Sequence, residues 1–200
     1  MGQTRLKLHI LLPLSIAGLV VISVLFFLFA YRQPSRPALP QYGEVPQFQF
    51  EESRGFAFGS SDMQGKINVV DFIFTSCQSA CPVMSARMAE LYRRFQHDDR
   101  IQFVSISVDP ENDTAEVLQA YAERYGVSDR RWVFLRAGAD SVKWLAEKGF
   151  KVSGGPPMMH STKFILVDAA GRIRGYYDPF DANTIKQLTF DIQHLLGRLQ

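Results

Sequence analysis

The chain has 200 residues, of which 46% are hydrophobic and 21% are charged, and its formal net charge is +2. This length allows one domain of moderate size plus an attachment. The small net charge and the lack of a long Lys/Arg run argue against a nucleic-acid-binding protein.

An uncharged, apolar segment occupies residues 8–31. About 20 such residues cross a bilayer as a helix, whereas the apolar core of a cleavable signal peptide has about 7–15. We therefore expect a single transmembrane anchor within residues 1–32, with a signal peptide as the alternative. Basic residues flank the segment on both sides, so the positive-inside rule hardly orients it. Since the tail does not resemble an organelle transit peptide, we expect a bacterial inner-membrane protein whose soluble domain lies in the periplasm.

Four prolines fall within residues 33–47, directly after this segment. Proline-rich chain is extended and cannot be helical. We expect residues 33–47 to be a semi-rigid linker and residues 48–200 to be the soluble domain.

The domain begins with two short apolar stretches, which predict short strands or a hairpin over residues 48–58, and a polar turn follows at 60–66. The run from 67 to 74 is β-branched and aromatic with little alternation, which is typical of a strand buried on both faces. The same reasoning predicts further strands at 101–108, 132–135, 163–167 and 172–177. Apolar spacing predicts helices at 82–96, 117–125 and 139–148, and one after Asp181.

Strands and helices therefore alternate along the chain until a closing hairpin and a last helix. Alternation predicts an α/β fold with a mostly parallel sheet covered by helices, and the hairpin adds an antiparallel edge. This order is that of a thioredoxin-like fold. Ligands of such sheets bind beyond the carboxyl ends of the strands, which is where Cys77 and Cys81 fall.

Cys77 and Cys81 are the only cysteines, and Pro82 follows them at once. Proline suits the first position of a helix and disfavours a helical residue before it, so we expect the pair on the loop that enters a helix. Backbone N–H groups at a helix start favour thiolates. The short spacing lets both sulfurs bind one metal ion or form a redox-active disulfide. A buried structural disulfide is the alternative, although so local a bridge constrains little chain entropy.

His160 stands just before a predicted strand and follows Met158 and Met159. In a thioredoxin-like sheet this loop faces the cysteine loop, where thioredoxins have a cis-proline. Two thiolates and one imidazole suit Cu(I), and imidazole is also acceptable to Cu(II), whereas structural zinc would need a fourth protein ligand. The alternative is an ordinary surface or core histidine. Either methionine is a conceivable soft ligand, but we expect both to pack in the loop.

Four motifs together resemble the Sco/SenC family of membrane-anchored, thioredoxin-like copper chaperones for cytochrome c oxidase assembly. They are Thr-Ser-Cys-Gln-Ser-Ala-Cys-Pro at 75–82, Ser-Val-Asp-Pro-Glu-Asn-Asp-Thr at 107–114, Trp-Val-Phe-Leu at 132–135, and His-Ser-Thr-Lys-Phe-Ile-Leu-Val-Asp-Ala-Ala-Gly at 160–171. The resemblance implies that Cys77, Cys81 and His160 are the copper ligands. Gln78 and Ala115 stand where the family commonly has proline, and neither change removes a ligand.

Two aspartates lie in the second of these motifs. Asp109 matches a family aspartate near the site, so we expect it in the second shell of the metal, with a turn cap before proline as the alternative. We expect Asp113 to cap the following helix.

Two functions of different classes follow. The first is copper delivery to the CuA centre of cytochrome c oxidase, with the copper-bearing subunit of that enzyme and other copper carriers as the partners that the resemblance implies. The second is a thiol–disulfide oxidoreductase that reduces a partner's cysteines, with Cys77 as the nucleophile and Cys81 as the resolving thiol. His160 discriminates between them, because only a copper site needs it. A peroxiredoxin-like peroxidase is a weaker alternative, since Thr75 lies one residue too close to Cys77 for that family's spacing.

Overall fold

The computed structural model describes residues 18–27, 37–155 and 160–199, and the chain divides into two compact units, Met1–Ala38 and Leu39–Gln200. In the first unit, residues 18–27 are helical. Within the described residues, no helix is both long enough and apolar enough to cross a membrane. Most of the anchor predicted over residues 8–31 lies outside those residues, so the anchor stays a prediction.

The second unit is built on a mixed sheet of eight strands among the described residues. The strands are β1 (Gly43–Glu44), β2 (Gln49–Glu52), β3 (Ala57–Gly59), β4 (Ile67–Ile73), β5 (Ile101–Ser107), β6 (Trp132–Arg136), β7 (Phe164–Val167) and β8 (Arg172–Tyr177). Their order across the sheet is β1-β8-β7-β4-β5-β6-β2-β3. β4, β5 and β6 are parallel, whereas β7 and β8 form an antiparallel hairpin beside β4, which confirms the predicted mixed α/β architecture.

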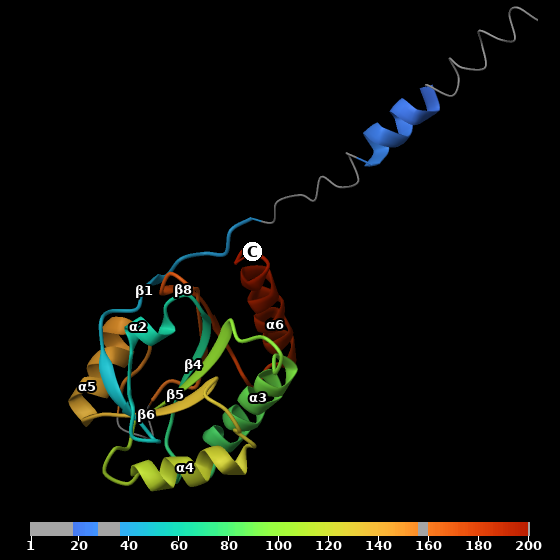
Figure 1. The fold of residues 1–200 in the computed structure, drawn as a ribbon. Helices are drawn as coiled ribbons and strands as arrows, with labels where there is room; N and C mark the ends of the chain where they lie inside the picture. Colours follow the sequence, from blue (N-terminus) through green and yellow to red (C-terminus); the bar gives the residue numbers. More distant parts are fainter. Residues whose placement is uncertain (1–17, 28–36, 156–159, 200) are drawn as a thin grey trace, which may run out of the picture. The chain divides into compact units, whose positions relative to one another are not determined.

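Helices cover both faces of this sheet (Figure 1). They are α2 (Ser60–Met63), α3 (Ala80–Arg94), α4 (Ala115–Arg124), α5 (Ala139–Trp144), the π-helical turn η1 (Leu145–Gly149) and α6 (Ala182–Leu196). Apolar side chains of α3, α4 and α6 form one hydrophobic core with the sheet, and those of α5 and η1 form the other. Every residue of β4 and β5 is buried, because both faces of these central strands are covered.

The compact unit starts at Leu39 rather than at residue 48, within the segment predicted as a linker. β1 is an edge strand that pairs with β8, and the N–H groups of Tyr42 and Val45 donate to carbonyls of Ile173 and Gly171, each at 2.9 Å. Extended chain of this kind still carries backbone groups that can pair with an open sheet edge. Proline content alone did not distinguish such an edge strand from a free spacer.

Three predicted local structures differ from the observed ones. The predicted turn at 60–66 contains α2, where the Asp62 side chain accepts from the Gly59 N–H at 2.8 Å. The predicted helix at 139–148 continues as η1, where the Phe150 N–H donates to the Leu145 carbonyl five residues earlier. α3 begins two residues before Pro82, so Cys81 lies in its first turn rather than on the preceding loop. A helix tolerates proline in its first turn, where the N–H has no partner within the helix.

Candidate functional site

The site lies at the carboxyl end of β4, as predicted. The loop of residues 74–79 joins β4 to α3 and carries Cys77, and Cys81 follows on the helix. β7 runs antiparallel beside β4, with Ile165 opposite Val70. The residues just before β7 therefore return to the same edge of the sheet, and this topology brings His160 to the cysteines.

Cys81 and His160 form a close pair. The Cys81 Sγ lies 3.8 Å from the His160 Nε2, and the Cys81 side chain is fully buried. The His160 Nδ1 lies 2.8 Å from the Ser161 carbonyl oxygen. A carbonyl can only accept, so the Nδ1 carries the proton and the Nε2 presents its lone pair to the cysteine. The Phe74 ring meets the imidazole edge-on, with centroids 5.5 Å apart. Two of the three predicted ligands are thus already adjacent and oriented.

Cys77 points differently. It is partly exposed, its Sγ lies 3.6 Å from the Ser79 Oγ, and it accepts the Cys81 N–H at 3.5 Å. Neither cysteine forms a disulfide. In the part of the chain that the structure describes, no three His, Cys, Asp or Glu side chains converge closely enough to hold a metal ion. The donor set suits a soft metal, but Cys77 must turn toward Cys81 and His160 to complete it.

The two thiols have very different pKa values. Burial raises the pKa of Cys81 to about 12, and the neighbouring Cys77 adds to this shift. Burial also opposes ionisation of Cys77, but the N–H groups of Cys81 and Ser79 and the Ser79 hydroxyl together lower its pKa to about 7. Burial lowers the pKa of His160, against the opposing hydrogen bond to Ser161. At neutral pH, Cys77 is therefore partly thiolate, whereas Cys81 and His160 are neutral.

Asp113 has a different position from the one predicted. It is fully buried, and its carboxylate accepts hydrogen bonds from the Thr75 N–H at 3.2 Å, the Thr75 hydroxyl at 2.5 Å and the Ser107 hydroxyl at 2.5 Å. The prediction that Asp113 caps α4 is wrong, because the cap is Thr114, whose Oγ1 accepts the Val117 N–H at 3.4 Å. The Asp-Thr pair offers two possible caps, and once the threonine is the cap, the aspartate is left for another partner.

Asp109 lies at the same edge of the sheet. Its carboxylate accepts from the Asn112 side chain at 2.9 and 3.0 Å, and its N–H donates to the Ser107 Oγ at 3.1 Å. None of the hydrogen bonds found for its side chain among the described residues reaches the two cysteines or the histidine. Its second-shell role stays a prediction. Met158 and Met159 lie outside the described residues.

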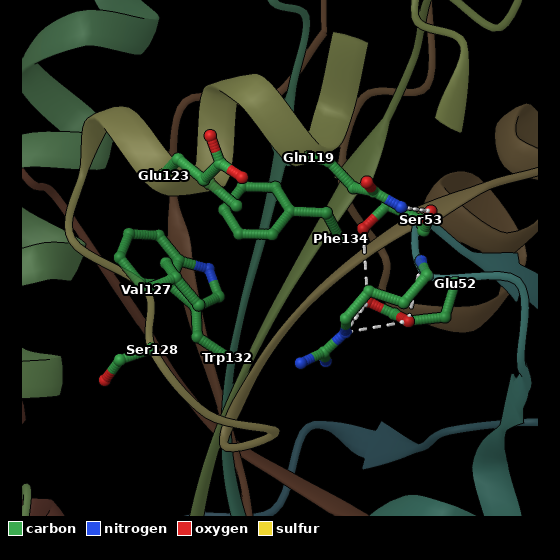
Figure 2. Close-up of a pocket in the computed structure, with 10 residues that line it drawn as sticks. Glu52, Ser53, Gln119, Glu123, Val127, Ser128, Trp132 and Phe134 are labelled. Atoms are coloured by element: carbon green, nitrogen blue, oxygen red, sulfur yellow. Dashed lines mark hydrogen bonds and ion pairs between the residues drawn. The ribbon is translucent and has the colours of Figure 1, made fainter. Parts of the chain in front are cut away.

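A separate cavity of about 260 Å³ lies between the end of β2, α4 and β6, and its lining includes none of the predicted site residues (Figure 2). Several of its polar side chains already have protein partners. The Arg54 Nε lies 3.0 Å from a Glu52 carboxylate oxygen, and the Gln119 amide donates to the Ser53 carbonyl at 2.6 Å.

Comparison with known proteins places this geometry in a family. The SCO1 protein homolog of Bacillus subtilis is 29% identical over 157 residues, which cover 75% of this chain and 81% of the relative. A SCO1/SenC family lipoprotein from Bacillus anthracis superposes with a TM-score of 0.73 at 30% identity, covering 80% of this chain and 99% of that one. BsSco, described as a member of the Sco family of cytochrome c oxidase assembly proteins with a disulfide switch, gives 0.70 at 28% identity, covering 78% and 95%.

More distant members share the fold. Yeast Sco1, solved with copper bound, gives a TM-score of 0.62 at 21% identity and covers 76% of this chain and 89% of that one. The family model described as SCO1/SenC matches residues 37–197, which is most of the chain. The resemblance inferred from the four motifs is thereby confirmed, and this chain belongs to the SCO1/SenC family.

Proposed function

We propose that this protein is a membrane-anchored copper-binding protein that delivers copper to the CuA centre of cytochrome c oxidase during its assembly. The observation that carries the proposal is the 3.8 Å separation of the Cys81 Sγ and the His160 Nε2, with Cys77 on the adjoining loop. Two sulfurs and an imidazole are donors that suit Cu(I), and the imidazole is also acceptable to Cu(II). Yeast Sco1 has been solved with copper bound, which supports copper as the cargo of the present protein.

The three ligands have different tasks in delivery. Cys81 and His160 are held in place by α3 and by the chain entering β7, so they form the fixed part of the site. Cys77 is partly exposed and partly thiolate at neutral pH, so it is the ligand that can meet incoming copper first and leave it last. Copper would pass to the partner by stepwise exchange of ligands, with the copper-bearing oxidase subunit or another copper carrier as that partner.

The location that we propose for this activity rests on the sequence alone. The apolar segment at residues 8–31 would tether the domain to the bacterial inner membrane, with residues 39–200 in the periplasm. A reporter fused after Gln200 tests the side directly. Activity of a periplasm-specific reporter supports the proposal, and activity of a cytoplasm-specific reporter contradicts both the topology and the delivery route.

The second candidate function is thiol–disulfide exchange, and the low pKa of Cys77 beside the neutral thiol of Cys81 favours it. The Cys77 thiolate would attack a partner's disulfide and form a mixed disulfide, releasing one partner thiolate. Cys81, after losing its proton, would then attack the Cys77 sulfur and release the second. The partner gains two electrons, and Cys77 and Cys81 become a disulfide. This reaction leaves His160 without a necessary role.

Two experiments separate the functions. In the first, the reduced full-length protein is titrated with copper, and we expect one copper per chain with greatly weakened binding in Cys77→Ser, Cys81→Ser and His160→Ala. In the second, His160→Ala is expressed at limiting copper in cells that lack the protein. Delivery predicts loss of oxidase activity, partly restored by added copper, whereas reduction predicts near-normal activity. If His160→Ala gives normal oxidase activity, copper delivery is refuted as the function and thiol–disulfide exchange takes its place.

A further inference from the structure

The buried carboxylate of Asp113 has no role in the site as described above. Its three hydrogen-bond donors are the N–H and hydroxyl of Thr75 and the hydroxyl of Ser107, and its side chain is fully removed from water. Burying a carboxylate costs several kcal/mol unless hydrogen bonds compensate, so the donors must be held where the carboxylate needs them. The network is therefore a firm link between the segments that carry these donors.

Those segments are the cysteine loop and the end of β5. Thr75 lies two residues before Cys77, and both its backbone N–H and its hydroxyl contact Asp113. Ser107 is the last residue of β5, and its hydroxyl also accepts the Asp109 N–H at 3.1 Å. Asp113 thus ties the start of the cysteine loop to the loop between β5 and α4.

The other end of the cysteine loop is fixed by α3, which begins at Ala80. Only residues 76–79 lie between the anchored Thr75 and the helix, and Cys77 is among them. The Cys77 Sγ lies 3.6 Å from the Ser79 Oγ and accepts the Cys81 N–H at 3.5 Å, so it is near Cys81 but, among the described residues, does not complete a metal site with Cys81 and His160. It must move to form a disulfide or to bind copper with that pair, and the anchor at Thr75 limits how far the loop can move away.

We propose that Asp113 is a positioning residue for Cys77. By holding Thr75 it confines the short loop, so that the Cys77 sulfur stays within reach of Cys81 and His160. Confinement of this kind raises the effective concentration of one group near another. The part of this inference that concerns copper rests on the proposed function, whereas the part that concerns the Cys77–Cys81 disulfide does not.

A purely structural role of Asp113 predicts something different. Loss of a buried hydrogen bond would then lower the free energy of unfolding without changing how readily the folded protein closes its disulfide or binds copper. Tyr177 supplies a matched control, because its hydroxyl donates to the buried carboxylate of Asp191 at 2.7 Å, and the hydrogen bonds found for that pair among the described residues include neither Thr75 nor Asp113.

The test uses the full-length protein and two substitutions of Thr75. Thr75→Val removes the hydroxyl but keeps the side-chain shape and the backbone hydrogen bond, whereas Thr75→Ser keeps the hydroxyl. Asp113→Asn is compared with them, and Tyr177→Phe is the control. Three quantities are measured for each: the unfolding temperature, the copper affinity of the reduced protein, and the equilibrium constant with glutathione. In that last reaction, oxidised glutathione and the two protein thiols give the protein disulfide and two reduced glutathiones.

We expect Thr75→Val and Asp113→Asn each to lower the glutathione equilibrium constant and the copper affinity by ~10-fold, as other outer-shell partners of metal ligands do. Thr75→Ser should restore both quantities toward wild type. Tyr177→Phe should lower the unfolding temperature alone. Thr75 and Asp113 act as one unit. The double variant Thr75→Val, Asp113→Asn should therefore lose much less free energy of copper binding and of disulfide formation than the sum of the losses in the two single variants.

The inference is overturned if Thr75→Val changes only the unfolding temperature, as Tyr177→Phe does. Should Asp113→Asn fail to fold, Thr75→Val and Thr75→Ser carry the test. Failure of wild-type protein to bind copper would refute the proposed function instead, and the glutathione constants would still decide the role of Asp113.

Discussion

The two cysteines lie four residues apart, yet their surroundings differ in almost every physical respect. Cys81 is on α3, fully buried, adjacent to His160 and has its pKa raised to about 12 by burial. Cys77 is on the loop before α3, partly exposed, turned toward Ser79 and has its pKa lowered to about 7 by neighbouring N–H groups, against the effect of burial. One thiol belongs to the core of the fold and the other to its surface.

This difference indicates a division of tasks within one site. A ligand held by helix and sheet retains a metal with little reorganisation, whereas a ligand on a loop can exchange between partners. In disulfide chemistry the same asymmetry assigns the attacking sulfur to Cys77 and the resolving sulfur to Cys81. Cys81 and His160 form the fixed side of the site, and Cys77 forms its exposed side. Substitutions can test whether the properties of one side change without those of the other.

The largest effect should follow removal of any one ligand. Cys77→Ser, Cys81→Ser and His160→Ala should each weaken copper binding by ~1000-fold or more, beyond the ~10–100-fold typical of second-shell changes. Competition with a chelator of known affinity measures this. The oxidised protein should bind poorly as well, because a disulfide offers no thiolate. If His160→Ala binds as tightly as wild type, His160 is not a ligand and the fixed side consists of Cys81 alone.

The next largest effect concerns alkylation of the two thiols. At pH 7 about half of Cys77 but only ~10⁻⁵ of Cys81 should be thiolate, from pKa values of about 7 and about 12. A more basic thiolate is intrinsically more nucleophilic, which recovers ~100-fold for Cys81 and leaves Cys77 at least ~100-fold more reactive. Iodoacetamide labelling of Cys81→Ser and Cys77→Ser measures each rate. Similar rates in the two variants would refute the asymmetry.

The next prediction concerns the burial of Asp71, which should make the free energy of unfolding depend on pH. This β4 residue is fully buried, and burial raises its pKa to about 7, against the opposing effect of the Ser105 hydroxyl on the neighbouring strand β5. The folded state therefore holds the proton more tightly than the unfolded state, whose pKa is about 3.9. Stability should fall as pH rises between these values, by roughly 2–4 kcal/mol in total.

Urea unfolding of wild type and Asp71→Asn from pH 5 to pH 8 measures this effect. Asn cannot ionise, so its unfolding free energy should decline less over that range. The titrations of Cys77 and His160 occur in both proteins and largely cancel in the difference. Parallel pH profiles for the two proteins would show that the Asp71 carboxylate is not buried as described.

Much of this arrangement could be predicted from the sequence, and the reason is topological. The alternation of buried strands and helices placed Cys77 and Cys81 at the end of β4, and the closing hairpin brought His160 back beside them. Position along a strand requires only periodicity and connection lengths. The resemblance of the four motifs to the Sco/SenC family then indicated that the metal is copper.

Other features depend on contacts between distant residues that no local pattern reveals. Asp113 looked like a helix cap, because only the folded chain shows that Thr75 and Ser107 surround it. The edge strand β1 looked like linker, because its partner, β8, lies far along the chain. Asp71 sits in a largely apolar run, and only the packed sheet shows that its carboxyl group is fully removed from water.

The smallest effect should come from the ring of Phe74, which faces His160 on the fixed side of the site, whereas the Phe74 backbone carbonyl accepts the Cys77 N–H at 3.3 Å. Its ring meets the His160 imidazole edge-on at 88°, with 5.5 Å between centroids, and it is 7% exposed. Edge-to-face pairs contribute about 0.5–1.5 kcal/mol beyond their buried area. Phe74→Leu keeps an apolar side chain but loses the ring, so we expect copper affinity to fall by roughly 2–10-fold, the equivalent of that energy. The alkylation rate of Cys77 should not change, because its thiolate is stabilised by N–H groups that this substitution leaves in place. Measuring both quantities on one preparation sharpens the comparison, since a change in both would show that the two sides of the site are mechanically coupled rather than separate.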